Sequence, residues 1–419
     1  MKIKIEDFDF KGRGFGRFEN KAVFLDGGII GDKVLASPIK EKKNYTEAKI
    51  IKILEPSPFR KNPTCPYYKN CGGCDFQELD YQKEIEWKTN KVKIDILKFS
   101  KEKINIPTTL KNDSTINYRN NIQLKVKDNK IGYFKKNSRE IVDIKKCEIA
   151  KTQINNTIKI LRNIKEVRKL TDIVIRQNEK EEVQVVLIGE KEINTNNILN
   201  KLLDIKLNSL YFNKKDKNKR YSDNFKKIYG EDYLEEEVLK NKFLISKESF
   251  FQVNKKQSEK LYLVAIDYLE INKDDIILDL YCGIGTTTLA LAKQSKSVVG
   301  VEVIDRAIRD ARLNAELNDI KNVRFITAKA EEIIDKLYES GFKPNKILLD
   351  PPRSGVDIKL IEQIKRLDVE RIVYISCNPT TQARDIELLK SMYKLEKIQP
   401  VDMFSKTVHV ETVVLMSRK

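Results

Sequence analysis

The sequence predicts an α/β protein whose C-terminal part is a doubly wound parallel sheet, preceded by a small β-barrel and an α+β region. Three patterns support this prediction. The N-terminal part has short strand-like runs separated by glycines, the central part mixes strand-like and helical runs, and the C-terminal part alternates strands and helices regularly. The chain has 419 residues, and at roughly 150 residues per domain this length suits three domains. We expect domains at residues 1–58, 59–242 and 243–419.

Composition narrows the kinds of function. Eighty Lys and Arg against 62 Asp and Glu give a net charge of +18, a broad positive field that suits a polyanion. His409 is the only histidine, which excludes sites that need two or more imidazoles, such as zincin and histidine-rich oxygenase centres. There is no apolar run of about 18 residues, and acidic residues occur where a signal peptide is apolar. We therefore expect a cytoplasmic protein without membrane spans.

The N-terminal segment alternates apolar and polar residues in short runs. Glycines separate these runs, which cover residues 2–10, 21–25, 33–39 and 46–54. Short strands with glycine at the corners are typical of an OB-like barrel, a common oligonucleotide-binding scaffold. The pattern is equally compatible with a purely structural barrel.

The central segment begins with a helical pattern at 80–99, which contains the only tryptophan, Trp87. Alternating runs follow at 122–126, 131–134, 173–176 and 183–188, with a helical stretch at 152–165. This mixture predicts an α+β domain.

A basic stretch lies between Leu210 and Lys227. It holds seven Lys and Arg against two Asp, and its aromatic residues are Tyr211, Phe212, Tyr221 and Phe225. Such a stretch is able to grip phosphates and stack on bases. A solvated lysine-rich hairpin explains the same composition.

The C-terminal segment alternates strand-like and helical runs. The strand-like runs are 276–280, 298–303, 323–326, 346–350, 371–376 and 412–416. In a doubly wound sheet, ligands bind at the carboxyl ends of the strands. The residues that follow each run are therefore candidates for a site.

A glycine-containing loop follows the first of these strands. Asp279-Leu-Tyr-Cys-Gly283-Ile-Gly285 opens a helix, so its glycines let the backbone approach a ligand. Glu302 ends the next strand, where a carboxylate accepts hydrogen bonds from ribose hydroxyls. Thr288 replaces the third glycine of the dinucleotide fingerprint, and Asp279 precedes the loop. We favour a Rossmann-like S-adenosylmethionine domain over an NAD domain, and an ordinary strand-helix turn is the alternative.

Two further strand ends carry reactive groups. Asp350-Pro-Pro-Arg353 presents a carboxylate on a proline-stiffened backbone, where it either orients a planar base or is solvated in a rigid turn. Cys377 precedes a predicted helix at 380–390. We expect the helix N-terminus and basic surroundings to lower the pKa of this thiol and make it a nucleophile. A buried structural cysteine is the alternative.

The last strand begins near two groups that can move a proton. His409 and Glu411 alternate along the chain, which predicts that they share one face at a strand mouth. We favour Glu411 as the proton carrier, because a lone histidine is more often a packing or orienting residue.

Three cysteines, Cys65, Cys71 and Cys74, lie in one short turn, and Cys147 is the only other cysteine before the glycine loop. Four thiolates make an iron-sulfur ligand set. Zinc is the main rival, although the gap from Cys65 to Cys71 is longer than zinc ligand pairs usually have. Disulfides are the least favoured in a cytosolic chain.

Taken in order, these motifs resemble the S-adenosylmethionine-dependent RNA uracil-5-methyltransferases, in particular the bacterial 23S rRNA enzymes with an iron-sulfur cluster. The resemblance covers nearly the whole chain. Its motifs are Ser-Phe-Phe-Gln252-Val-Asn, Asp-Leu-Tyr281-Cys-Gly-Ile-Gly, Val-Glu302, Asp350-Pro-Pro-Arg, Ser-Cys377-Asn-Pro and His-Val-Glu411-Thr. The N-terminal barrel looks like the family's TRAM domain, and Cys65, Cys71, Cys74 and Cys147 match its [4Fe-4S] ligands.

The resemblance implies a role for each site residue. It implies that Cys377 adds to carbon 6 of uracil and that Glu411 removes the carbon 5 proton. The residues implied to contact the cofactor or the base are Gln252, Tyr281, Glu302 and Asp350. It also implies that the helix at about 77–106 packs with the catalytic domain.

The expected substrate is a uridine of 23S rRNA, modified by a monomeric enzyme. The nearest alternative is uridine 54 of tRNA, since the same motifs serve both substrates. A hypothesis of another class is a non-catalytic RNA-binding or assembly protein that keeps the fold.

Overall fold

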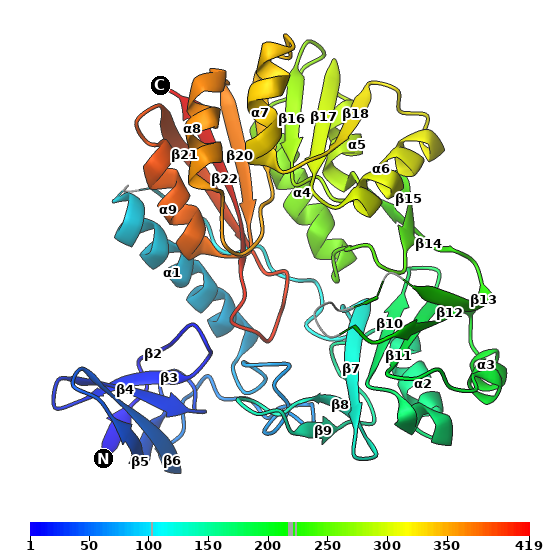
Figure 1. Ribbon diagram of the computed structural model, residues 1–419. Helices are drawn as coiled ribbons and strands as arrows, with labels where there is room; N and C mark the ends of the chain where they lie inside the picture. Colours follow the sequence, from blue (N-terminus) through cyan, green and yellow to red (C-terminus); the bar gives the residue numbers. More distant parts are fainter. Residues whose placement is uncertain (102–103, 217–220, 223) are drawn as a thin grey trace.

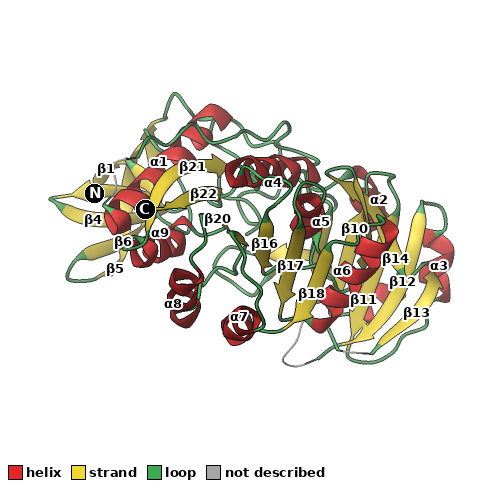
Figure 2. Ribbon diagram, turned by 90° about the horizontal axis from the view of Figure 1, so that it is seen from above, coloured by secondary structure: helices red, strands yellow, loops and turns green. Residues whose placement is uncertain are grey.

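The structure is a computed structural model that describes residues 1–101, 104–216, 221–222 and 224–419 (Figure 1). Its described parts form a six-stranded N-terminal sheet, a seven-stranded central sheet, a two-stranded ribbon and a seven-stranded C-terminal sheet. In both views the N-terminal and central sheets lie toward opposite ends of the molecule (Figure 2). No helix within the described ranges is long and apolar enough to cross a membrane.

The N-terminal sheet has the strand order β1-β5-β6-β4-β3-β2. Its strands are β1 (Lys2–Lys4), β2 (Asp7–Phe8), β3 (Gly14–Phe18), β4 (Lys21–Asp26), β5 (Lys33–Glu41) and β6 (Tyr45–Glu55). The run predicted at 2–10 is two strands, and β3 was not predicted. Gly16 in β3 packs so closely that a Cβ there would lie 2.4 Å from the Lys4 carbonyl oxygen. A strand that requires glycine lacks the apolar alternation that reveals the others.

A long helix, α1 (Tyr81–Ser100), confirms the helix predicted at 80–99. The Asp80 side chain caps its N-terminus by accepting hydrogen bonds from backbone N–H groups. Val92 and Ile96 are buried in the core of the C-terminal sheet, and α1 lies beside α9 (Pro379–Leu389) (Figure 1). Trp87 packs on Phe8 of the barrel. Helix α1 therefore joins the barrel to the C-terminal sheet.

The central sheet has the order β13-β12-β11-β10-β7-β8-β9. Its elements are β7 (Asn121–Lys127), β8 (Lys130–Phe134), β9 (Ile141–Asp143), α2 (Thr152–Leu161), a 3₁₀ turn (Lys165–Lys169), β10 (Asp172–Gln177), β11 (Val183–Gly189), α3 (Asn196–Leu202), β12 (Leu207–Lys214) and β13 (Phe225–Gly230). Strands β10 and β11 are buried along their whole length. The α+β arrangement expected here is present.

The basic stretch at 210–227 does not present its aromatic residues as first expected. Tyr211 and Phe212 lie in β12 and are only 1% and 4% exposed, so base stacking by these two rings was a wrong prediction. Burial in the sheet outweighs the polar sequence around them. Four of the positions between β12 and β13, residues 217–220, and residue 223 lie outside the described residues.

The C-terminal sheet has the order β18-β17-β16-β19-β20-β22-β21. The two-stranded ribbon of β14 (Tyr233–Val238) and β15 (Asn241–Ser246) and the helix α4 (Lys255–Leu269) precede this sheet in the chain. The strands of the sheet and the helices between them are β16 (Ile276–Leu280), α5 (Thr286–Ala292), β17 (Ser297–Glu302), α6 (Asp305–Leu317), β18 (Val323–Thr327), α7 (Ala330–Glu339), β19 (Lys346–Leu349), α8 (Ile358–Leu367), β20 (Arg371–Ser376), α9, β21 (Tyr393–Val401) and β22 (Glu411–Arg418). The first five strands of the order are parallel, as predicted. Strand β22 pairs antiparallel with β20 and β21, so the prediction that every strand of this sheet is parallel was wrong. Strands β21 and β22 are joined without a crossover helix. Two neighbouring strands can be parallel only if a crossover connects them, so these two are antiparallel.

Candidate active site and cysteine pocket

The sheet brings the site residues together at one edge. Tyr281, Asp350 and Cys377 each follow directly after a parallel strand, and Glu302 is the last residue of β17. Strand β22 runs the other way, so its first residue, Glu411, lies at the same edge. The pairing of Ser376 with Thr412 places Cys377 beside Glu411. Residues far apart in sequence thus meet because of strand direction and register.

The glycine loop after β16 exposes its backbone. Gly283 has φ +54°, and a Cβ added there would have no neighbour within 4 Å. Its N–H donates to Glu302 Oε2 at 3.3 Å, while the Ile304 N–H donates to Glu302 Oε1 at 3.0 Å. The loop is therefore held against Glu302 with open space above the glycine.

Asp279 is fixed below this loop. It is 1% exposed, and its Oδ2 accepts hydrogen bonds from Thr287 at 2.8 Å and Thr288 at 2.6 Å. Its Oδ1 has no hydrogen-bond partner within the described part of the chain. Burial raises the pKa of Asp279 to about 6. Thr288, which stands where a dinucleotide fingerprint has glycine, therefore has a structural task, and the buried Oδ1 is free to accept from a ligand.

A pocket of about 580 Å³ opens beside the loop. Its lining includes Tyr281 and Glu302 together with Pro352 and Arg384. Gln252, Asp350, Cys377 and Glu411 are not among its lining residues, although Tyr281 and Pro352 adjoin that group in the chain. The exposed Gly283 backbone, the Glu302 carboxylate and the unpaired Asp279 oxygen fit an adenosine-type cofactor such as S-adenosylmethionine.

The loops around Cys377 and Asp350 are tied to each other. The Asn378 side chain donates to the Arg353 carbonyl oxygen at 3.1 Å, and the Thr381 hydroxyl donates to the same oxygen at 3.2 Å. These bonds hold the proline-stiffened turn against the start of α9. The carboxylate and the thiol are thereby kept at the same sheet edge.

The expected lowering of the Cys377 pKa was wrong. Burial, which is the largest effect, and the negative charge of Glu411 together raise the pKa to about 11, although Arg353 opposes both. A helix N-terminus is visible in the sequence, whereas the neighbouring carboxylates become visible only in the fold. The thiol form of Cys377 is therefore the stable one at neutral pH.

The two carboxyl groups nearest Cys377 also resist ionisation. Burial and the charge of Asp350 raise the pKa of Glu411 to about 8, while Arg353 lowers it. Burial, followed by the charge of Asp279, raises the pKa of Asp350 to about 7. Such values suit groups that exchange protons near neutral pH.

His409 lies outside the last strand. Strand β22 begins at Glu411, and His409 belongs to the connection before it, so the prediction of a shared strand face was wrong. Burial lowers the pKa of His409, and Arg353 adds to this effect. The last strand therefore begins two residues later than the sequence pattern suggests.

Gln252 is held by two residues that sequence reasoning did not assign. The Asn120 side chain donates to the Gln252 carbonyl oxygen at 3.1 Å, and Tyr262 of α4 hydrogen-bonds the Gln252 side chain. Asp350 and Glu411 both act on the pKa of Tyr262, which burial raises. Tyr262 therefore belongs to the same buried group, and no sequence motif marked it.

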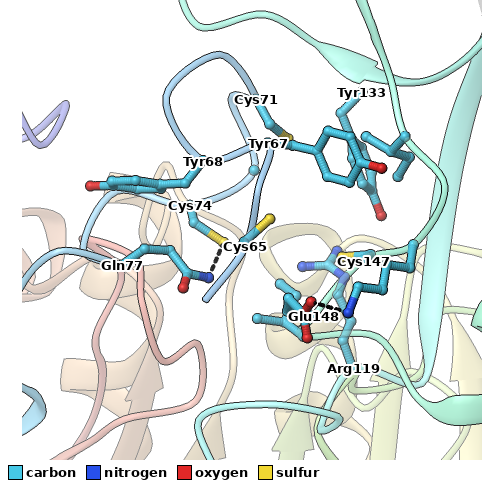
Figure 3. Close-up of a pocket in the computed structure, with 14 residues that line it drawn as sticks. Cys65, Tyr67, Tyr68, Cys71, Cys74, Gln77, Arg119, Tyr133, Cys147 and Glu148 are labelled. Atoms are coloured by element: carbon cyan, nitrogen blue, oxygen red, sulfur yellow. Dashed lines mark hydrogen bonds and ion pairs between the residues drawn. The ribbon is translucent and has the colours of Figure 1, made fainter. Parts of the chain in front are cut away.

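The second site is a pocket around the four predicted cysteines. Cys65, Cys71 and Cys74 come from one loop, and Cys147 faces them across a cavity of about 220 Å³ (Figure 3). The six cysteines of the chain are all free thiols. Gln77 donates a hydrogen bond to the Cys74 sulfur at 3.6 Å. The three-plus-one grouping predicted from the sequence thus lines a single cavity.

As placed, the described side chains include no group of three or more His, Cys, Asp or Glu arranged to hold one metal ion. Ligands of a multi-iron cluster bind separate iron atoms and stand farther apart than ligands of a single ion. Burial raises the pKa of Cys71 to about 11 and that of Cys74 to about 12, so both need a cation to become thiolates. Four soft donors therefore line one cavity, and this ligand type suits both an iron-sulfur cluster and a zinc ion.

Comparisons with protein families cover most of the chain. The family model of tRNA (uracil-5-)-methyltransferases matches residues 80–419. The model of the TRAM domain matches residues 1–51. The two matches together cover the barrel, helix α1, the central sheet and the C-terminal sheet.

Individual relatives agree with the family models. An uncharacterized RNA methyltransferase of Clostridium acetobutylicum is 37% identical over 100% of this chain and 96% of its own. One of Staphylococcus aureus is 35% identical over 99% of this chain and 97% of its own. Among solved structures, the Pyrococcus abyssi tRNA (uracil-54, C5)-methyltransferase in complex with S-adenosyl-L-homocysteine is similar with a TM-score of 0.82 and 26% identity, covering 99% of this chain and 100% of that one.

Proposed function

This chain belongs to the tRNA (uracil-5-)-methyltransferase family, and we propose that it methylates carbon 5 of a specific uridine in 23S rRNA. The observation that carries this proposal is the meeting of Cys377, Glu411 and Asp350 at one sheet edge, beside a pocket suited to an adenosine-type cofactor. A thiol and a carboxyl group in this arrangement are what methylation of a weakly nucleophilic carbon requires.

In the proposed mechanism, Cys377 adds to carbon 6 of the uracil and makes carbon 5 electron-rich. The thiol must lose its proton on addition, and the Asp350 carboxylate, one of the two acidic groups that act on Cys377, would accept it, which leaves the Glu411 carboxylate available for the later step. S-adenosylmethionine, when bound, supplies an electrophilic methyl group. Glu411 then removes the carbon 5 proton, the carbon 5–carbon 6 double bond reforms, and the Cys377 sulfur leaves carbon 6.

We assign the cofactor to residues around the glycine loop. Glu302 would accept hydrogen bonds from ribose hydroxyls, and Tyr281 lines the same pocket. Gln252 and Asp350 lie toward the reacting atoms, where they would orient the methyl donor or the base. The open backbone at Gly283 supports this assignment, because any side chain there would occupy the space a ligand needs.

We further propose that Cys65, Cys71, Cys74 and Cys147 bind a [4Fe-4S] cluster. Their shared cavity supports the proposal. Methyl transfer involves no net oxidation or reduction, so the cluster would shape the protein or the RNA surface. Purification without oxygen, followed by absorbance and metal analysis, tests it: zinc alone, stoichiometric with the chain, would contradict the cluster.

The proposed partner is RNA, bound by a monomer. The match to a TRAM domain and the net charge of +18 support contacts to phosphates. The target uridine must leave its stack to reach Cys377, at a cost of a few kcal/mol that such contacts offset. We expect the reaction to take place in the cytoplasm.

A second candidate substrate is tRNA. The similarity over the whole chain to a tRNA (uracil-54, C5)-methyltransferase favours it. The four-cysteine pocket favours rRNA, because its cysteines resemble the cluster ligands of the 23S rRNA enzymes. The proposed catalytic residues, Cys377 and Glu411, would act in the same way on either RNA.

The deciding experiment measures transfer of labelled methyl groups from S-adenosylmethionine to unmodified 23S rRNA and unmodified tRNA in parallel. Labelled 5-methyluridine in rRNA is the expected result, and mapping then gives its position. Label in tRNA alone would keep the reaction and overturn the substrate. Absence of label in both RNAs, with cofactor still bound, would favour a non-catalytic RNA-binding protein.

A further inference from the structure

The connection between β21 and β22, residues 402–410, ends directly before Glu411. We call it the 402–410 segment. Asp402 and Ser405 within it are fully buried, and so is Met403. It is a polar connection packed inside the protein, and it precedes the proposed catalytic base.

Three charged groups meet at the start of this segment. Lys88 and Glu84 of α1 and Asp402 all have side chains that are 0% exposed. The Lys88 Nζ donates to Glu84 Oε1 at 2.8 Å and to Asp402 Oδ1 at 2.5 Å. It also donates to the Phe404 carbonyl oxygen at 3.2 Å. Lys88 thus ties the segment to α1 through both a side chain and the backbone.

Stability alone is a weak explanation for this cluster. Taking charges out of water costs about as much as their attraction returns, and apolar replacements of similar size are often neutral or stabilising. A buried cluster does, however, fix the positions of its members, since any displacement leaves a charge unpaired. Its benefit here is therefore geometric.

Other bonds hold the same segment from two more directions. Tyr81 of α1 donates to Asp402 Oδ2 at 2.6 Å, and Tyr118 donates to the Ser405 carbonyl oxygen at 3.0 Å. From the cysteine-bearing loop, the Asp75 N–H donates to the Lys406 carbonyl oxygen at 2.8 Å. The segment is therefore fastened to α1, to the entry of the central sheet and to the cysteine pocket.

We propose that the Lys88–Glu84–Asp402 cluster positions the 402–410 segment, and through it Glu411, for removal of the carbon 5 proton. This inference rests on the proposed function. The pairing of Val401 with Glu411 brings the start of the segment beside the proposed base, so a displacement of the segment would be passed on to Glu411. The three residues are positioning residues, since none of them lies among the groups that meet the base.

The test separates proton removal from the earlier steps. RNA in which 5-fluorouridine replaces the target holds fluorine at carbon 5, so it cannot lose a proton there and remains bound to Cys377. Trapping on this RNA measures thiol addition and methyl transfer, whereas turnover on natural RNA also needs Glu411. A defect in proton removal lowers turnover, spares trapping and leaves methylated natural RNA covalently bound.

The variant Glu84→Gln, Lys88→Met, Asp402→Asn removes all three charges together. Lys406, whose Nζ lies 3.9 Å from Glu84 Oε2, loses that ion pair but keeps its hydrogen bond to the Leu79 carbonyl oxygen. We expect trapping within about threefold of the parent enzyme, turnover lower by about tenfold or more, and covalent methylated RNA on denaturing gels. If the triple variant does not fold, the single change Asp402→Asn is expected to give a smaller effect with the same pattern.

A matched control removes another buried ion pair. Lys346 and Asp275 are 3% and 1% exposed, their Nζ and Oδ2 atoms are 2.7 Å apart, and they lie at the opposite edge of the same sheet. The double variant Lys346→Met, Asp275→Asn should leave the ratio of covalently bound methylated RNA to released product unchanged. A folded cluster variant with parental turnover, or with equal losses of trapping and turnover, would overturn the inference. A parent enzyme that neither methylates nor traps RNA would instead overturn the proposed function.

Discussion

The proposed catalytic edge, where Cys377, Asp350 and Glu411 lie, and the cysteine pocket are assembled in different ways. At the catalytic edge, strand ends and register set the positions of Cys377 and Glu411. In the cysteine pocket, irregular loops bring Cys74 and Cys147 to one cavity. A sheet fixes its edge whether or not a ligand is present, whereas loops around a metal depend on the metal for much of their order. Changes at the first site should therefore affect chemistry, and changes at the second should affect folding.

The largest effect is expected for Cys377→Ala. Without the thiol, carbon 5 is not activated, so methyl transfer should fall by at least about 10⁴-fold, the scale on which loss of a catalytic nucleophile acts. Labelled methyl transfer to RNA measures this rate. Cofactor and RNA binding should be retained and serve as the control. Turnover within tenfold of the parent would remove Cys377 from the mechanism.

The next largest effect is expected for Glu411→Gln. An amide does not remove the carbon 5 proton, so turnover should fall by about 10²–10⁴-fold. Trapping on 5-fluorouridine RNA should persist, because it precedes this step, and methylated RNA should accumulate on Cys377. If the variant released product at the parental rate, another group would be the base.

The pH dependence sharpens the same comparison. The pKa of Glu411 is raised from its ordinary value of 4.5 to about 8, so the carboxylate form becomes abundant only as the pH rises through 8. Single-turnover product release should therefore rise about tenfold per pH unit below this pKa and level off above it. A carboxyl group with the ordinary pKa of 4.5 would be fully ionised above pH 6. A release rate that is flat between pH 6 and pH 9 would therefore contradict this role.

The same shift has a consequence for stability. Because the folded state disfavours the Glu411 carboxylate, this group costs stability as the pH rises from 4.5 toward 8, and the full cost is present above 8. At pH 9, Glu411→Gln should therefore have a higher melting temperature than the parent and a free energy of unfolding larger by a few kcal/mol, at about 1.4 kcal/mol per pKa unit. At pH 4 the two proteins should differ little. A variant stabilised equally at both pH values would show that charge is not the cause.

The smallest effect on chemistry is expected from the cysteine pocket. On the proposal that this pocket binds an iron-sulfur cluster, Cys74→Ser should lower the bound iron and the melting temperature. Cys377 adduct formation per folded molecule should stay within about tenfold of the parent, because no reacting atom lies in this pocket. Iron analysis, thermal unfolding and trapping on 5-fluorouridine RNA measure the three quantities. Loss of trapping in a variant that keeps its iron and its fold would contradict the separation of the two sites.

Patterns of local periodicity predicted much of the fold. The helix at 80–99 and the five parallel strands were visible because their apolar residues repeat at helical or strand spacing. Strand β3 was missed because its glycines replace the apolar residues. The direction of β22 was missed because nothing in a strand's own sequence reveals its neighbour. Tyr211 and Phe212 were misjudged because burial depends on the whole sheet.

The site was predictable by residue type but not by environment. Glu302 and Asp350 were singled out as strand ends, and both lie at the carboxyl edge of the C-terminal sheet, whereas Gln252 was implied only by the family resemblance. The pKa of Cys377 was misjudged because it depends on carboxyl groups that are distant in sequence. Lys88 and Asp402 lie 314 residues apart, so their contact was outside the reach of any local pattern.

The most direct test of the account is to map the covalent bond formed with 5-fluorouridine RNA. After incubation with S-adenosylmethionine, protease and nuclease digestion followed by mass spectrometry would identify the modified peptide. The account predicts one adduct, a methylated fluorouridine nucleotide bound to the sulfur of Cys377, and none in Cys377→Ala. An adduct on another residue, or 5-methyluridine formed by Cys377→Ala, would contradict it.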